Sequence, residues 1–225
     1  MNAKRFLTKD GVERVRGAIA QAEHRTSAEF VCAVATESGR YDRAESVWGL
    51  LFGLGAMALV SGMDVATLQG TGSWSRGAYF ASSLQGFAVI AGFMVGSIVA
   101  SFVHPLRMLL VSRAEMASEV DRAAAYVFGL GRLRATQGGA GVLVYVSLSE
   151  RRVVVLADEN ALKVIGQAGL DAARDAALVC LREGKREETF IAAISCLEGP
   201  LAEKMPATDA VNELPDSVLV FPTRP

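Results

Sequence analysis

Two long uncharged runs interrupt an otherwise mixed pattern of apolar and polar positions. Residues 46–63 contain no charged side chain, and neither do residues 77–106 when His104 is neutral. A helix of roughly 20 apolar residues crosses a hydrocarbon core about 30 Å thick. The pattern therefore predicts a transmembrane hairpin with spans at 46–63 and 80–104 and a short external loop. Two buried core helices are the alternative, but such helices usually keep a polar stripe.

The segments on either side of the hairpin have the periodicity of an α/β domain. Apolar residues recur at helical spacing in four segments, and consecutive apolar residues form three shorter runs. The first of these runs is typical of a strand covered on both faces, and the two later runs, joined by a polar turn, favour a β-hairpin. The predicted helices are 8–25, 113–130, 171–182 and 187–204, and the predicted strands are 29–35, 142–146 and 153–156.

Neither flanking segment forms a domain alone, because the first offers one helix and one strand with nothing to cover the second face of that strand. Together the segments supply three strands and enough helices for both faces of a sheet. We therefore expect a three-layer α/β sandwich with a mixed central sheet, interrupted by the inserted two-helix hairpin. The expected boundaries are 1–45 and 107–206 for the two parts of the domain, 46–106 for the hairpin and 207–225 for a C-terminal tail.

Basic residues concentrate on one side of the predicted spans. Five arginines flank the outer ends of the hairpin, whereas its connecting loop contains Arg76, balanced by Asp64. Because basic residues are enriched in cytoplasmic segments, both termini and both parts of the domain are predicted to be cytoplasmic. The expected location is the bacterial cytoplasmic (inner) membrane, as a multi-pass protein. The flanking residues are Arg40, Arg43, Arg107, Arg113 and Arg122.

Small residues recur at helical spacing within both spans. Gly49 and Gly53 are four apart in the first span, as are Gly92 and Gly96 in the second, and Ser97 and Ser101 follow. Such faces let helices approach closely, either within the hairpin or between copies, although glycine is also frequent in membrane helices generally. Neither span contains a charged residue, so we expect the hairpin to anchor the protein rather than to form an ion path.

Composition adds few chemical candidates. A mean hydropathy of +0.30 is high for a chain with 21% charged residues, which supports the membrane prediction. The net charge of −1, without a basic run, argues against nucleic acid as a partner. Three cysteines, Cys32, Cys180 and Cys196, lie among apolar residues, which is typical of reduced, buried thiols. The glycine-rich segment 138–141 precedes a strand and lacks Gly-Lys-Ser/Thr, so it is predicted to be a flexible connection rather than a phosphate-binding loop.

Several segments outside the hairpin resemble one known family. Ala22–Val31 is similar to the helix-to-strand junction of the TPM domain, formerly a domain of unknown function. Gly141–Val153 resembles its central hairpin, which is followed by an aspartate loop at Asp158. Leu181–Gly184 and Asn212–Asp216 fit the bacterial membrane-protein branch of the family. The resemblance covers nearly everything outside the hairpin and rests on the order and spacing of the segments rather than on one specific motif.

This resemblance implies an α/β sandwich with a mixed sheet between helices. Family members have been described as acid phosphatases, as divalent-cation binders and as accessory proteins for membrane complexes, so it does not by itself assign an activity. The chain departs from the pattern at three places. Ala28 stands where relatives tend to have glycine, the loop 136–141 lacks an expected arginine, and the aspartate loop, often Asp-Arg-Gly-Ile, reads Asp158-Glu159-Asn160-Ala161. The acidic Glu159 would repel a phosphate monoester unless a metal intervened.

The best candidate site is therefore acidic. Asp158 and Glu159 follow the end of one predicted strand, and Glu29 begins another. Carboxylates that converge at a sheet edge are suitable ligands for Ca²⁺ or Mg²⁺, and a metal there would activate water towards a phosphate ester. In the alternative, Asp158 caps the following turn, Glu159 is solvated and Glu29 is a surface residue. No other cofactor is predicted.

Two functions from different classes follow from these observations. The preferred one is a non-enzymatic accessory or scaffold module, held in the lipid bilayer and working through contact with another membrane protein or with a second copy. The alternative is a metal-dependent, acid-phosphatase-like hydrolase at the inner membrane surface. The departures in the aspartate loop weaken the second.

Overall fold

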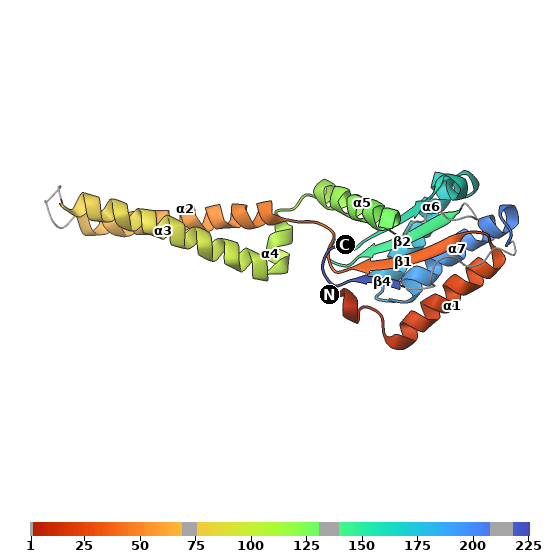
Figure 1. Ribbon diagram of the computed structural model, residues 1–225. Coiled ribbons are helices and arrows are strands. Elements are labelled where there is room, and N and C mark those ends of the chain that lie inside the picture. The colour runs from red at the N-terminus through yellow and green to blue at the C-terminus, as the bar shows by residue number, and fades with distance from the viewer. Residues whose placement is uncertain (1, 69–75, 131–139, 208–217) are drawn as a thin grey trace. The chain divides into compact units, whose positions relative to one another are not determined.

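The computed structural model describes residues 2–68, 76–130, 140–207 and 218–225, without the side chains of residues 63–68, 76–82 and 104. The chain divides into two compact units (Figure 1). The first, the α/β unit, combines Met1–Gly39 with Ala114–Pro225, and the second, the hairpin unit, is Arg40–Arg113. The two parts of the α/β unit are thus separated in sequence by the whole of the hairpin unit.

A four-stranded mixed sheet forms the centre of the α/β unit, in the order β3-β2-β1-β4. β1 is parallel to β2 and to β4, whereas β2 and β3 are antiparallel neighbours in a hairpin. The mixed sheet and the β2–β3 hairpin are confirmed as predicted. The strands are β1 (Glu29–Ala35), β2 (Gly141–Ser147), β3 (Arg152–Ala157) and β4 (Val218–Phe221).

Helices cover both faces of β1, which explains why this strand is apolar from Phe30 to Ala35. Alternate residues Phe30, Cys32 and Val34 belong to a buried cluster with residues of three helices, α1 (Lys9–Arg25), α6 (Glu159–Arg182) and α7 (Glu188–Lys204). The intervening residues Val31, Ala33 and Ala35 belong to a second cluster with α5 (Arg113–Leu130). Figure 1 shows α5 on one side of the sheet and α1 and α7 on the other.

Two elements of the α/β unit differ from the sequence prediction. Residues 207–225 were expected to be a tail, yet β4 extends the sheet by pairing with residues 32–35 of β1. α6 begins at Glu159 rather than at residue 171, and Gly166, with a φ of 69°, interrupts its helical backbone. That break separates the first turns from the amphipathic part that periodicity detected. A short 3₁₀ helix, η1 (Ala3–Arg5), precedes α1.

The hairpin unit contains two long helices, α2 (Asp42–Leu68) and α3 (Arg76–Phe102), and a short one, α4 (His104–Leu109). α2 and α3 pack through their glycines. A Cβ on Gly92 would lie 2.8 Å from the Phe52 carbonyl oxygen, and one on Gly96 would lie 2.8 Å from the Trp48 carbonyl oxygen. Only glycine permits backbones to approach this closely. Of the alternatives for the small-residue faces, the structure has the one in which they meet within the hairpin.

Candidate functional site

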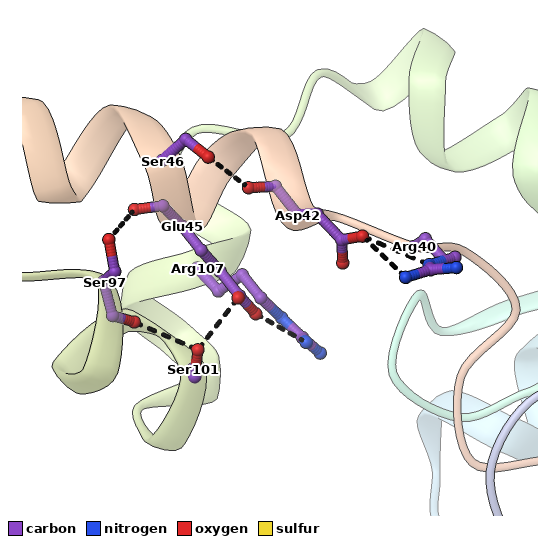
Figure 2. A network of polar contacts seen from close by, with 7 residues as sticks. All are labelled: Arg40, Asp42, Glu45, Ser46, Ser97, Ser101 and Arg107. Atoms are coloured by element: carbon purple, nitrogen blue, oxygen red, sulfur yellow. Dashed lines mark hydrogen bonds and ion pairs between the residues drawn. The ribbon is translucent and has the colours of Figure 1, made fainter. Parts of the chain in front are cut away.

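One end of the hairpin carries a set of mutually bonded polar side chains, the hairpin polar cluster, made of Glu45, Ser97, Ser101 and Arg107 (Figure 2). Glu45 lies in the first turn of α2. The Ser101 hydroxyl donates to Glu45 Oε2 at 2.8 Å, and Arg107 Nη1 lies 3.5 Å from Glu45 Oε1. Ser97 donates to the Glu45 backbone oxygen at 3.5 Å. The cluster therefore joins α2, α3 and α4 at a single point.

Further contacts hold α4 against the beginning of α2. The Trp48 indole N–H donates to the Leu106 carbonyl oxygen at 2.9 Å. The Arg107 guanidinium carbon lies 5.9 Å from the centroid of the Tyr41 ring, within the range of a cation–π contact. Pro105 occupies the start of α4, where a missing N–H costs nothing. Arg107, the basic residue of α4, is thus directed towards protein rather than towards solvent, with only 15% of its side chain exposed.

Along the described parts of α2 and α3, the exposed surface is mostly apolar. Two segments, Asp42–Gly62 and Ser83–Phe102, are long and apolar enough to cross a membrane. Large side chains point outward along both helices, among them Phe87, which is 72% exposed, and Ile90, which is 60% exposed. Others are Leu50, Leu51, Leu54, Leu59, Met94, Val95 and Ile98. The glycine faces of α2 and α3 are therefore buried against each other, and the faces with bulky apolar side chains are left uncovered.

A second polar group, the sheet-end network, lies buried in the α/β unit and consists of Ser38, Tyr145, Ser147 and Glu150. Ser38 follows β1, whereas Tyr145 and Ser147 end β2, so the residues meet at the carboxyl ends of two parallel strands. The Ser38 hydroxyl donates to Ser147 Oγ at 2.7 Å and lies 2.8 Å from the Tyr145 hydroxyl. Ser147 in turn donates to the Glu150 carboxylate.

The Glu150 carboxylate is the terminal acceptor of this network. It also accepts the backbone N–H groups of Ser38, at 3.0 Å, and Gly39, at 3.3 Å. Because Ser38 gives its only hydroxyl proton to Ser147, Tyr145 must be the donor to Ser38. Burial raises the pKa of Tyr145 to about 12, and the charge of Glu150 adds to this rise.

Sequence reasoning missed the sheet-end network. Glu150 was interpreted as part of an ordinary polar turn, yet it is 8% exposed. The available signal was the presence of two hydrogen-bonding side chains, Tyr145 within the apolar run 142–146 and Ser147 directly after it. Buried polar groups require partners. The partners lie on a segment that precedes the hairpin in sequence, and periodicity could not identify them.

The three predicted metal ligands occupy different local environments. Asp158 is the N-cap of α6 and accepts the Ala161 N–H at 2.8 Å. Glu159 is exposed and forms an ion pair with Lys163 at 2.8 Å, a contact that lowers the pKa of its carboxyl. Glu29 pairs in register with Gly141, which also accepts the Asp158 N–H, so Glu29 and Asp158 lie at the same end of the sheet. Within the described residues, no group of three potential metal ligands converges.

The remaining predicted features have a limited structural counterpart. Cys32 is buried in the sheet as predicted, and desolvation raises the pKa of its thiol far above the ordinary range. The prediction of burial is wrong for Cys196, which is exposed on α7, and Cys180 is only partly buried. Most of the glycine-rich loop, residues 131–139, and the segment 212–216 lie outside the described residues. So do residues 69–75 of the loop predicted to join the two spans.

No family model matches this chain, and no curated protein matches it. Its fold is similar to that of the BA42 protein from the psychrophilic bacterium Bizionia argentinensis, a structure solved by NMR. The TM-score is 0.55 at 17% sequence identity, and the alignment covers 96% of this chain and 95% of that protein. A likeness at this identity concerns the fold alone, so the resemblance to the TPM domain stays a prediction.

Proposed function

We propose that this protein is a membrane-anchored accessory or scaffold module, in which a transmembrane hairpin holds a cytoplasm-facing, TPM-like α/β domain. In this proposal the domain is a three-layer α/β sandwich, and the hairpin is an insertion between β1 and α5. The module acts by contact with another membrane protein or with a second copy.

The observation that carries the proposal is the exposure of the apolar helices α2 and α3. A core helix of a soluble protein is mostly buried, whereas only 17% and 11% of the two candidate spans are buried inside the structure. Soluble proteins rarely expose apolar patches larger than a few hundred Å². A bilayer covers such a surface and requires the helical backbone hydrogen bonds that α2 and α3 already make.

The charges near the hairpin support a cytoplasmic orientation. Arg40, Arg43, Arg107 and Arg113 belong to the end of the hairpin unit that holds its first and last residues. Arg76, at the start of α3, is at the opposite end of the helices. The excess of arginine therefore favours placing both parts of the α/β domain in the cytoplasm.

The sheet-end network supports a structural rather than a chemical role for the polar groups of the domain. Its hydroxyl and carboxylate groups satisfy one another inside the protein, as buried polar groups must. This arrangement stabilises the junction between the first and second parts of the domain. Contact with a partner, rather than turnover of a substrate, is the function that we therefore favour.

The proposal is tested in membranes from cells expressing the full chain with Cys180→Ser and Cys196→Ser. The protein should stay in the membrane pellet after alkaline carbonate extraction. A cysteine introduced as Thr71→Cys should react with a membrane-impermeant maleimide from outside, and one introduced as Asp121→Cys should react only after lysis. Extraction by carbonate would refute the anchor, and the reverse labelling pattern would refute the orientation.

The accessory role is tested by chemical crosslinking in intact membranes. Crosslinking should give a discrete adduct of this protein with a partner or with a second copy, and recovery of the monomer alone would contradict the accessory role.

A further inference from the structure

The segment that follows α3 reverses the usual distribution of polar and apolar side chains. Residues 102–110, which we call the interfacial segment, include α4. Phe102 is 85% exposed and Leu109 is 73% exposed, and Val103 and Leu110 are also exposed. Arg107, in the same segment, is mostly buried by contacts with Glu45 and Tyr41. In a protein surrounded by water, the opposite arrangement is expected.

Specific contacts fix this segment on the hairpin. A six-residue helix is not stable by itself. α4 persists here because Trp48 donates to the Leu106 carbonyl oxygen and because Arg107 lies against Glu45. The segment also belongs to the same compact unit as α2 and α3. The exposed side chains are therefore held in place and are not part of a loose linker.

The position of the segment indicates what covers it. Phe102 is the last residue of α3, so the apolar surface of the interfacial segment continues directly from that of the second candidate span. At this point the chain also carries Trp48 and Arg107, residue types that concentrate where the hydrocarbon core meets the headgroups. Short apolar helices next to such residues lie in the plane of that boundary.

We propose that the interfacial segment lies in the boundary between headgroups and acyl chains, with Phe102, Val103, Leu109 and Leu110 inserted into lipid. The inference rests on the proposed membrane anchor and extends it, because residues 107–110 were expected to begin the soluble domain. In this arrangement the anchor has three membrane-contacting elements. α4 sets the depth of the hairpin, and the ion pair of Arg107 with Glu45 lets a charged side chain remain at that depth.

The experiment is a measurement of spin-label immersion in the full chain, reconstituted into phosphatidylcholine–phosphatidylglycerol vesicles. The background is Cys180→Ser with Cys196→Ser, and buried Cys32 is retained. Labels are placed one at a time at Leu109→Cys and Phe102→Cys, with Ile90→Cys as the mid-span reference and Asp121→Cys, an exposed position of α5, as the aqueous reference. Collision rates with oxygen, which partitions into lipid, and with a water-soluble nickel chelate are compared at each site.

We expect the ratio of oxygen to nickel collisions at Leu109 and Phe102 to exceed that at Asp121 clearly and to fall below that at Ile90. A ratio equal to that at Asp121 would show that the segment is in water and would overturn the inference. Shielding of both labels from both reagents would show protein coverage instead, and would also overturn it. If Ile90 itself gives the aqueous ratio, the membrane anchor fails, which distinguishes failure of the proposed function from failure of this inference.

Discussion

The Glu150 carboxylate accepts the backbone N–H of Ser38 at 3.0 Å, although the whole hairpin unit lies between these residues in sequence. Ser38 is in the segment that leaves β1, and Glu150 is in the turn between β2 and β3. Backbone bonds accompany this contact, because Leu148 donates to the Ala35 carbonyl and Ser149 donates to the Thr36 carbonyl. The first part of the domain is thus bound to the second immediately before the chain enters the hairpin unit.

Replacing Glu150 should destabilise the protein. Glu150→Ala removes the acceptor of two backbone N–H groups and of the Ser147 hydroxyl. Leaving buried donors without a charged acceptor should lower the free energy of unfolding by about 2–3 kcal/mol. Thermal unfolding in detergent, with amide exchange at Ser38 and Gly39, measures the effect. Glu13→Ala is the control, because Glu13 forms an exposed pair with Arg16. An equal, small effect of both changes would contradict the role of Glu150.

Stability should decline at high pH because of Tyr145. The phenol of the unfolded chain ionises near its ordinary pKa of 10.0, whereas the folded phenol keeps its proton up to a pKa of about 12. Unfolding therefore releases a proton between these values, and the free energy of unfolding falls as the pH rises from 10 to 12. The contribution is fully present below pH 10. Denaturant titrations on both sides of pH 10 should show a smaller decline in Tyr145→Phe, and parallel declines would show that Tyr145 is not responsible.

Excision of the hairpin should leave a folded, soluble domain. Replacing residues 44–110 with a short Gly/Ser linker keeps β1 and β2, which pair along seven positions from Glu29–Gly141 to Ala35–Ser147. It also keeps the sheet-end network. Size-exclusion chromatography should show a soluble species, and its thermal unfolding should be cooperative. An aggregated or unfolded product would mean that the domain needs its anchor in order to fold.

Enlarging Gly92 should weaken packing between α2 and α3. The new Cβ of Gly92→Ala would meet the Phe52 carbonyl oxygen at 2.8 Å and the Gly53 Cα at 3.0 Å, backbone atoms that cannot rotate away. Such overpacking costs about 1–3 kcal/mol. The matched control is Gly55→Ala, since a Cβ at Gly55 would have no neighbour within 4 Å. Detergent-induced unfolding of the full chain should occur earlier for Gly92→Ala alone. Identical curves for the two variants would contradict the glycine interface.

Asp158 provides a test that separates a helix cap from a metal ligand. Asp158→Ala should lower stability by about 1 kcal/mol through loss of the N-cap of α6, whereas Asp158→Asn, which can still accept the Ala161 N–H, should change it little. Calorimetric titration with Ca²⁺ and Mg²⁺ then tests the predicted site of Asp158, Glu159 and Glu29. Binding to the original protein that disappears in Asp158→Asn would support the metal-dependent hydrolase, and absence of binding would leave Asp158 a cap.

Much of the fold could be predicted because its elements carry strong local signals. β1 and α5 have the predicted bounds, since β1 is apolar from its second residue to its last and α5 has a clear apolar face. β4 was not predicted because four residues are too few for a period to emerge, and their strand conformation depends on pairing with β1. The early turns of α6 were missed because Gly166 breaks the helical repeat.

The sites were less predictable because they depend on tertiary contacts. The sequence drew attention to Asp158 and Glu159, which stand out as acids beside an apolar strand. It did not identify Glu150, whose carboxylate accepts the backbone N–H groups of Ser38 and Gly39, more than a hundred residues earlier. Arg107 was used only as one of the basic residues that predict the orientation of the hairpin. Its contacts with Glu45 and Tyr41 were not predicted. Local composition reveals charged residues but not the groups that they bind.

During synthesis, β1 leaves the ribosome before either of its neighbours in the sheet, because β2 and β4 are both encoded after the hairpin. Until residues 141–147 have been translated, this strand, which is apolar from Phe30 to Ala35, has no partner and is prone to aggregate. In the arrangement proposed above, both spans are complete before that pairing is possible. In that arrangement both spans reach the membrane while the sheet is still incomplete, and β1 gains its second neighbouring strand only when β4 has been translated.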